Sequence, residues 1–255
     1  LSSLKLWCWG ENNYGQMATG AAGGTYKQPR RINTGLISDK EITKVAAGAN
    51  NVCVIAQTPN TPSTARAYCW GWNIYGQLGN NTVVDQYSPV QFGGTVSGLS
   101  GKQIKDIDTN DYHTCVVTTD STANVWCAGL NNSGQLGNGN NTGPFICPGA
   151  SPWGVNKACA KEPVNSSTIA GINPKSIGTG SNFTCVLYPA VWCWGANNYG
   201  QIGDGTTTNR LTITRANGSA SATAQVMAVG DYHVCVIVTE TKARVQCWGR
   251  NTSGP

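Results

Sequence analysis

The sequence predicts an all-β protein built from repeated, four-stranded antiparallel units. The first observation is a recurring strand end, Cys-Trp-Gly or a close variant, whose copies begin at Cys8, Cys69, Cys127, Cys193 and Cys247. The second is a Gly-Gln pair a few residues later, which follows the first four copies at Gly15, Gly76, Gly134 and Gly200. Self-similarity at a spacing of a few tens of residues indicates a repeat architecture.

One unit near the middle of the chain shows the expected strands. Residues 103–108 alternate polar and apolar side chains, as a half-buried strand does, and residues 111–117 are rich in β-branched side chains. Residues 124–129 form the third strand, and the Gly and Asn residues of 130–137 suit a compact loop with positive φ angles. In most units a short strand after a proline completes the set, as in 88–92. Four short antiparallel strands without helical periodicity are typical of a β-propeller blade.

We therefore expect residues 1–255 to form one propeller domain or a fragment of one. The predicted units are 1–35 (partial), 42–92, 104–148 with an insertion at 143–175, 176–214 and 225–255 (partial). This gives about four complete blades plus partial blades.

The repeat resembles that of the regulator of chromosome condensation family. The resemblance is clearest in 180–187, Gly-Ser-Asn-Phe-Thr-Cys-Val-Leu, and in 192–205, Trp-Cys-Trp-Gly-Ala-Asn-Asn-Tyr-Gly-Gln-Ile-Gly-Asp-Gly. It implies a β-propeller, usually of seven blades, so either these units are part of a larger ring or this propeller is atypical in its blade number. The regularly placed cysteines make the chain similar to the secreted, disulfide-stapled members. The nucleotide-exchange activity of the founding member is not carried over, because its surface loops have no residue-by-residue match here.

The eleven cysteines predict disulfide bonds within the blades. A cysteine on an upstream apolar strand precedes four of the Cys-Trp-Gly strands, as facing positions of a hairpin require. The predicted pairs are Cys53–Cys69, Cys115–Cys127, Cys185–Cys193 and Cys235–Cys247, with Cys147–Cys159 flanking the insertion. Zinc is the rival interpretation, but it favours clustered CxxC or Cys/His pairs, which do not occur. Disulfides favour an oxidising, extracellular compartment.

Cys8 is left over by this pairing, and we expect its partner on a strand upstream of Leu1. Composition excludes other classes. The 17 basic and 12 acidic residues are thinly spread, and without a basic run we expect no nucleic-acid partner. No stretch of 18 apolar residues occurs, so we expect no membrane insertion.

Catalytic groups are hard to find in this sequence, and we expect no enzyme activity, cofactor or metal. His113 and His233 occupy a repeat position that holds Asn51 and Phe183 in other units, which indicates packing. Nucleophile motifs are absent. Asp106 and Asp108 are expected to be solvated edge carboxylates in preference to a weak cation site. Asp204 lacks the repeated acidic spacing of a calcium loop.

Tryptophan and asparagine supply the candidate surface residues. The recurrent Trp9, Trp70, Trp194 and Trp248 are expected to pack between blades. Trp72 and Trp153 fall outside that position, so they are the candidates for an exposed contact surface. Among seven Asn-x-Ser/Thr sequons, the candidates for glycosylation are Asn80, Asn140, Asn165 and Asn217, which we expect to lie in loops.

The leading functional hypothesis is a non-enzymatic, extracellular protein-interaction or structural module of a secreted or cell-surface protein, including a filament-forming one. Its partner would be another protein or a neighbouring subunit, contacted through the segments 57–66, 93–101 and 143–175. The alternative is a soluble binder, either an inhibitor of a secreted enzyme or a glycan-binding lectin. An intracellular exchange factor is a third class, and it would carry free thiols.

Overall fold

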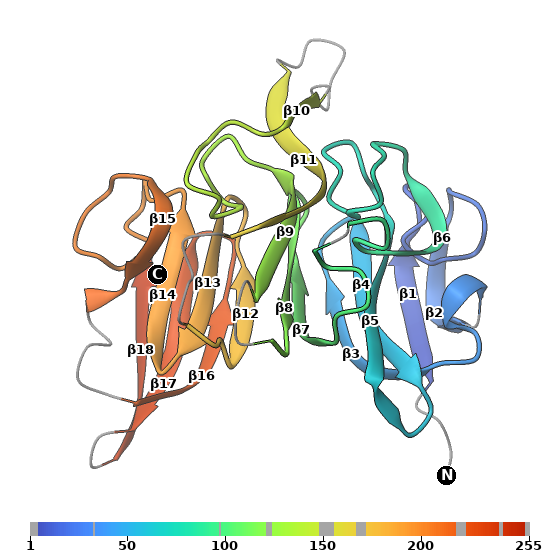
Figure 1. Ribbon diagram of the computed structural model, residues 1–255, viewed down its shortest axis with the longest axis horizontal. Coiled ribbons are helices and arrows are strands. Elements are labelled where there is room, and N and C mark those ends of the chain that lie inside the picture. The colour runs from blue at the N-terminus through green and yellow to red at the C-terminus, as the bar shows by residue number, and fades with distance from the viewer. Residues whose placement is uncertain are drawn as a thin grey trace.

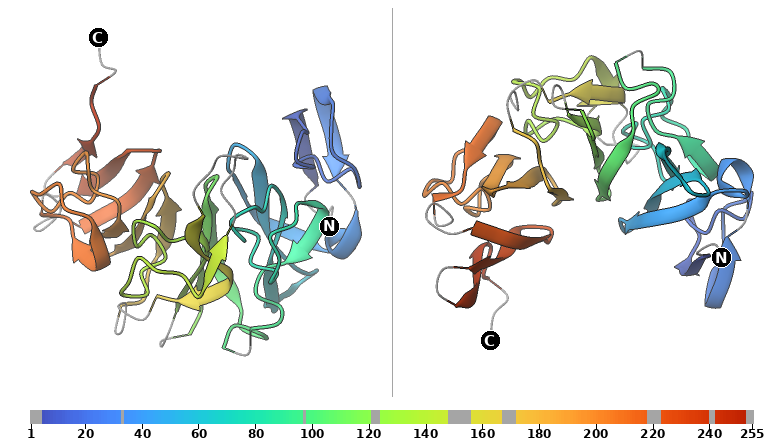
Figure 2. Two further views of the ribbon diagram at one scale, coloured as in Figure 1. Left: turned by 90° about the horizontal axis from the view of Figure 1, so that it is seen from above. Right: turned by 60° about the horizontal axis from the view of Figure 1, so that its bottom comes forward.

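The protein is an all-β, propeller-like arc of antiparallel sheets. The computed structural model describes residues 5–32, 34–96, 98–120, 124–147, 156–166, 172–217, 223–239 and 242–252. Within these ranges the regular elements are strands, apart from one short 3-10 helix, η1 (Gly35–Ile37). The sheets stand side by side along the arc, with the two ends of the chain at its two ends (Figures 1 and 2). None of the helical residues described forms a segment long and apolar enough to cross a bilayer.

Five sheets, here called blades A to E, follow one another along the chain. Blade A pairs β1 (Leu6–Glu11) with β2 (Thr25–Ile32). Blade B has β3 (Glu41–Ala47), β4 (Asn51–Thr58), β5 (Thr61–Gly71) and β6 (Gln86–Gln91) in that order. Blade D has β12 (Ser176–Thr179), β13 (Phe183–Tyr188), β14 (Ala190–Gly195) and β15 (Arg210–Arg215). Blade E has β16 (Thr223–Val229), β17 (His233–Thr239) and β18 (Ala243–Gly249).

Blade C has five strands, in the order β10-β11-β9-β8-β7. Its inner strands are β7 (Ile104–Thr109), β8 (His113–Thr118) and β9 (Val125–Leu130), followed by β11 (Lys157–Asn165) and the short edge strand β10 (Phe145–Cys147). The segment 143–175, predicted as an irregular insertion, therefore supplies the fourth strand of this blade. The prediction missed β11 because Pro163 interrupts its pattern. That proline lies in the register shift between Ala160 and Val164, where a residue without an N–H is tolerated.

The hydrophobic core lies between adjacent blades. Separate clusters fill the junctions, as where Leu78 of blade B packs with Ile107 and Val116 of blade C. The other junctions have their own clusters of buried side chains. The confirmed fold class, an all-β propeller of antiparallel blades with disulfides inside the blades, therefore depends on contacts between neighbouring repeats.

Three of the four recurrent tryptophans connect these junctions, as the sequence predicted, and Trp9 is the exception. The indole Nε1 of the Cys-Trp-Gly tryptophan donates to the backbone carbonyl of the Gly-Gln glutamine in the preceding unit. The three links are Trp70 to Gln16 (2.8 Å), Trp194 to Gln135 (2.9 Å) and Trp248 to Gln201 (3.0 Å). Blade C has Ala128 at this position, and there Trp126 and Phe92 join the buried cluster instead. Trp9 of the first repeat is 61% exposed.

All five predicted cysteine pairs are joined as disulfides. Four connect directly opposed residues of neighbouring strands, with Cα–Cα distances of 4.1–4.2 Å. The fifth, Cys147–Cys159, connects β10 to β11 with a Cα–Cα distance of 5.8 Å. Cys8 is the free cysteine of the described residues, and burial raises the pKa of its thiol to about 11. That Cys8 pairs with an upstream strand stays a prediction.

Candidate functional site

The loops that follow the Cys-Trp-Gly strands share one internal hydrogen-bond pattern. In blade B the buried Asn73 accepts from the Leu78 N–H (2.9 Å) through Oδ1 and donates to the Val84 carbonyl (3.0 Å) through Nδ2. Gln77 accepts from the Tyr75 N–H through Oε1 (3.0 Å). Asn12, Asn131 and Asn197 play the role of Asn73 in their loops. In each loop the asparagine amide forms hydrogen bonds with backbone groups that would otherwise bind water, so the loop is held in one conformation.

Neighbouring loops are also fixed to one another. Gln77 Nε2 donates across the junction to the Asp111 carbonyl (2.8 Å). The Asp111 carboxylate accepts from the N–H groups of Ala49 (2.7 Å) and Asn50 (3.2 Å). The pKa of this carboxyl is raised mainly by its burial, against the lowering effect of those two N–H groups. We call the surface formed by these loops the loop face; it comprises the loops of Asn12, Asn73, Asn131 and Asn197 and the neighbouring turns of Asn50 and Asp111.

A cluster of aromatic rings lies on the loop face around Trp72. The Trp72 ring centroid lies 5.7 Å from Tyr14, 5.6 Å from Tyr75 and 6.2 Å from Tyr112, which come from blades A, B and C. Tyr75 and Tyr112 also meet edge to face at 6.0 Å. Tyr75 is buried, whereas the other three rings are half-buried. The cluster therefore combines packing between blades with ring surface that solvent or a partner can reach.

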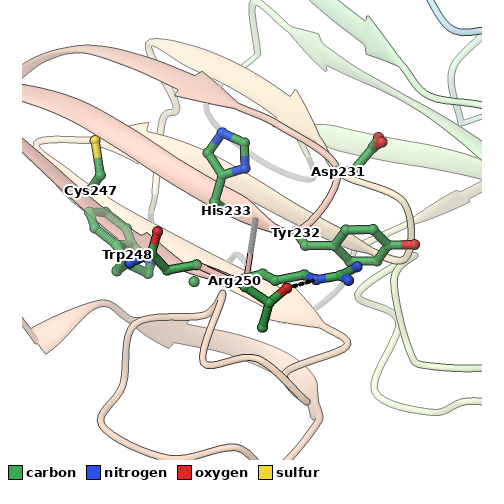
Figure 3. Close-up of a pocket in the computed structure, with 9 residues that line it drawn as sticks. Asp231, Tyr232, His233, Cys247, Trp248 and Arg250 are labelled. Carbon is green, nitrogen blue, oxygen red and sulfur yellow. Dashed lines mark hydrogen bonds between the residues drawn. The ribbon is translucent and has the colours of Figure 1, made fainter. Parts of the chain in front are cut away.

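A second aromatic pair occupies the equivalent loops of blades D and E. Tyr199 and Tyr232 meet edge to face at 5.5 Å, and the Arg250 guanidinium lies 5.1 Å from the first ring and 5.4 Å from the second. Arg250 Nε also donates to Thr252 Oγ1 (2.7 Å), the dashed line in Figure 3. Next to this pair lies a cavity of about 740 Å³ on blade E, whose lining includes Asp231, Tyr232 and Arg250.

The hairpin of β10 and β11 projects from the top of the arc in the view of Figure 1. The Cys147–Cys159 disulfide belongs to one buried cluster with Tyr75 and Leu130, against which Trp72 also packs. Ile146 at the hairpin is 67% exposed. The loop face thus offers Tyr, Trp and Asn side chains on a fixed, Gly-containing backbone, together with an exposed apolar edge. This is the composition of surfaces that recognise other proteins.

The two predicted contact tryptophans have different outcomes. Trp72 lies at the centre of the aromatic cluster, and Trp153 lies outside the described residues. Sequence reasoning missed Tyr14, Tyr75 and Tyr112. For the first two a signal was present, because Tyr recurs immediately before the Gly-Gln pair in three loops.

The four glycosylation candidates lie at different depths, and their modification stays a prediction. Asn140 and Asn217 are exposed, although Asn217 Nδ2 donates to the Asp204 carbonyl (2.7 Å). Asn80 is half-buried. Asn165 was expected in a loop, but it ends β11 and its Nδ2 donates to the Val125 carbonyl (3.1 Å).

The two histidines share a repeat position but not an environment. His113 is fully buried between blades C and D, where its Nε2 lies 2.8 Å from Thr184 Oγ1. Burial lowers the pKa of its imidazole to about 3, so the ring is neutral and closed to a substrate. His233 is exposed on the cavity side of blade E (Figure 3).

The expectation that Asp106 and Asp108 are solvated edge carboxylates is wrong. Asp106 is 5% exposed, forms an ion pair with Lys44 of blade B and accepts from the Ile177 N–H of blade D (2.8 Å). Asp108 accepts from the Thr179 N–H (2.7 Å). Both carboxylates join blades, because the inner strands lie close enough for their side chains to reach the next sheet.

Asp204 likewise binds protein groups. Its Oδ2 forms an ion pair with Arg210 (2.6 Å), and its Oδ1 accepts from the Thr206 N–H (3.0 Å). Burial alone would raise the pKa of this carboxyl, but the hydrogen bonds from Thr206, Arg210 and Asn197 lower it overall. Across the residues that the structure describes, no three His, Cys, Asp or Glu side chains gather as a metal site would require.

The sequence matches models of a known repeat. The model of the regulator of chromosome condensation (RCC1) repeat matches residues 5–55, 65–117 and 190–237, and a second model of the same repeat matches 104–135. The matched residues cover more than half of the chain.

Curated relatives and solved structures agree with this match. The chain is 28% identical to the human E3 ubiquitin-protein ligase HERC2 over 258 residues, which covers 99% of this chain and 5% of HERC2. It is 26% identical to the ultraviolet-B receptor UVR8 of Arabidopsis thaliana, over 88% of this chain and 45% of the receptor. The chain thus spans less than half the length of either relative.

The solved structures show the same fold at low identity. Human WBSCR16 superposes with a TM-score of 0.69 at 18% identity, over 96% of this chain and 57% of that one. A structure of yeast RCC1 (Prp20) bound to Kap60 superposes with a TM-score of 0.66 at 15% identity, over 98% and 51% of the two chains. The chain belongs to the regulator of chromosome condensation (RCC1) repeat family.

Proposed function

We propose that the chain is a non-enzymatic, extracellular protein-interaction module that binds its partner through the loop face. The observation that carries the proposal is the aromatic cluster around Trp72, whose rings come from three blades. Its loops are fixed before binding, so little conformational entropy is lost when a partner docks.

The relatives support the binding role. Yeast RCC1 (Prp20) was crystallised bound to Kap60, and Prp20p from Saccharomyces cerevisiae has binding properties to Gsp1p and histones. Those partners belong to the yeast protein. What this chain shares with it is the propeller fold.

Five disulfides support the extracellular part of the proposal, because such bonds persist where thiols are oxidised. Mass mapping of the native protein without reduction tests it. We expect the ten cysteines of the five pairs to be bonded, and Cys8 to be bonded to a cysteine outside residues 1–255. Eleven reduced thiols would contradict an extracellular location.

Site-specific photocrosslinking tests the loop face itself. A photoreactive residue at Tyr199, which is 44% exposed on that face, should give a discrete adduct in the native medium. The comparison position is Ser63, which is exposed near the β4–β5 turn and lies in the segment 57–66 that the sequence named as a rival contact surface. An adduct formed equally well from Ser63, or from Ser63 alone, would remove the loop face as the binding surface.

A further inference from the structure

The exposed edge of blade A concentrates positive charge. Lys27, Arg30 and Arg31 lie on β2, and all three are exposed. Residues 5–32, which contain blade A, hold four of the 17 basic residues but only one of the 12 acidic ones, so about a ninth of the chain carries +3 of the net +5. Blade A lies at one end of the arc and blade E at the other (Figure 2).

Arg31 links two small cavities on this edge. It lines one cavity of about 190 Å³ together with Lys5, Lys40 and the hydroxyl-bearing Ser38. It also lines a second of about 190 Å³ with Arg30. Thr19 and Thr34 add hydroxyl groups to the second cavity. Each volume suits one sulfate or carboxylate group, and basic and hydroxyl side chains are the donors that such anions accept from.

The charges of β2 are not balanced by the protein. Within the described part of the chain, no carboxylate lies within ion-pair distance of Lys27, Arg30 or Arg31. Asp39, in the first cavity, lies 3.7 Å from Lys40, and its side chain is 81% exposed. Arg30 is held over the Tyr26 ring at 5.3 Å. Like charges gathered in this way repel one another until an anion binds.

Protection of a free sheet edge is the alternative explanation for these charges. Lysines and prolines on edge strands prevent unwanted strand pairing. Pro29, in the middle of β2, already removes a donor from that edge. Edge protection therefore does not explain why Arg30 and Arg31 both line cavities. The proline also argues against a partner that adds a β-strand to this edge.

We infer that this surface, the basic edge of blade A (Lys5, Lys27, Arg30, Arg31 and Lys40), binds an anionic polysaccharide. Regularly spaced sulfate or carboxylate groups would enter the two cavities joined by Arg31. Trp7, the register partner of Arg31 on β1, is 51% exposed, and an indole face beside basic side chains suits the stacking of a sugar ring. The site is separate from the loop face and does not depend on it.

Retention on immobilised heparin, a sulfated uronate polysaccharide, tests the inference. The variant is R30Q/R31Q, and the control is K242Q/R244Q at the exposed end of blade E, which lowers the net charge by the same amount. Because each exposed ion pair strengthens binding by a few-fold, we expect about tenfold weaker binding for R30Q/R31Q. The control should stay within about twofold of the original chain. Equal losses in both variants would overturn the site, because the attraction would then follow net charge alone.

Competition in solution identifies the class of polyanion. Free heparin should displace the protein at lower charge concentration than polyglutamate or duplex DNA. A desulfated, carboxylate-only heparin distinguishes the two anionic groups, since retained competition assigns the cavities to carboxylate and lost competition assigns them to sulfate. Stronger competition by polyglutamate or DNA would overturn the polysaccharide assignment. Thermal melting of both variants checks that folding is intact.

Discussion

Replacing His113 with phenylalanine should make the protein more resistant to mild acid. The imidazole is fully buried and its pKa is lowered to about 3, whereas an unfolded chain protonates it with the ordinary pKa of 6.5. The neutral ring therefore contributes stability that is fully present above pH 6.5, and that is lost as the pH falls from 6.5 toward 3. At about pH 5 the loss is about 2 kcal/mol, from roughly 1.36 kcal/mol for each pH unit below the unfolded pKa.

The repeat itself shows that phenylalanine is compatible with this position. Phe183 fills it in blade D and is fully buried. Loss of the imidazole does not leave the Thr184 hydroxyl without a hydrogen bond, because that hydroxyl also donates to the Gln135 carbonyl (2.9 Å). The His113 Nδ1 has no partner in the described structure, so no second hydrogen bond is lost.

Urea unfolding at about pH 7.5 and pH 5 measures the effect. The unfolding free energy of the original chain should fall by about 2 kcal/mol more than that of H113F between the two conditions. Because the difference in unfolding free energy between the two pH values is taken for each protein separately, a pH-independent cost of packing the larger phenylalanine ring cancels. The matched control is H233F, because His233 occupies the same repeat position in blade E but is exposed. Equal pH dependence in H113F and the original chain would refute the reasoning.

Three further predictions concern the links between and within blades. Trp70→Phe removes the indole donor to Gln16 and should lower the unfolding free energy by about 1–2 kcal/mol, whereas an unchanged urea midpoint would contradict the link. Asp106→Ala leaves the Ile177 N–H without its acceptor and should lower the unfolding free energy by about 2–3 kcal/mol. The control, Asp39→Ala, should have the unfolding free energy of the original chain. C147S/C159S should raise hydrogen exchange at the β10–β11 hairpin and leave blade D protected. Loss of protection across blade D would show that this disulfide supports the whole arc.

The strands and disulfides could be predicted because they depend on local periodicity. In Cys115–Cys127, for example, a short hairpin sets the register, and the two cysteines become directly opposed residues. Such a pair needs no knowledge of the neighbouring blades. β11 was missed because its pattern is broken by Pro163 and because it pairs with β9 across a long intervening segment.

The candidate site could be predicted only in part, because it is formed where units meet. Trp72 could be singled out because it lies outside the repeated packing position. Its three aromatic neighbours lie in the loops of different blades, so no single unit of sequence contains the cluster. Asp106 was misjudged for the same reason, since its partners Lys44 and Ile177 lie in the blades on either side.

In each loop a variable residue stands next to an invariant asparagine. The residue after the Cys-Trp-Gly glycine differs in every unit, while the next residue is always asparagine. In order, the variable residues are Glu11, Trp72, Leu130, Ala196 and Arg250. Because four of the following asparagines hold their loops by matching hydrogen bonds, the variable position can change without changing the backbone. Leu130 and Ala196 there are buried and serve packing, whereas Trp72 is half-buried and Arg250 is exposed, with its cation over the Tyr199 ring. The same fold therefore uses this position for packing in blades C and D, and for an aromatic or a charged contact on the loop face in blades B and E.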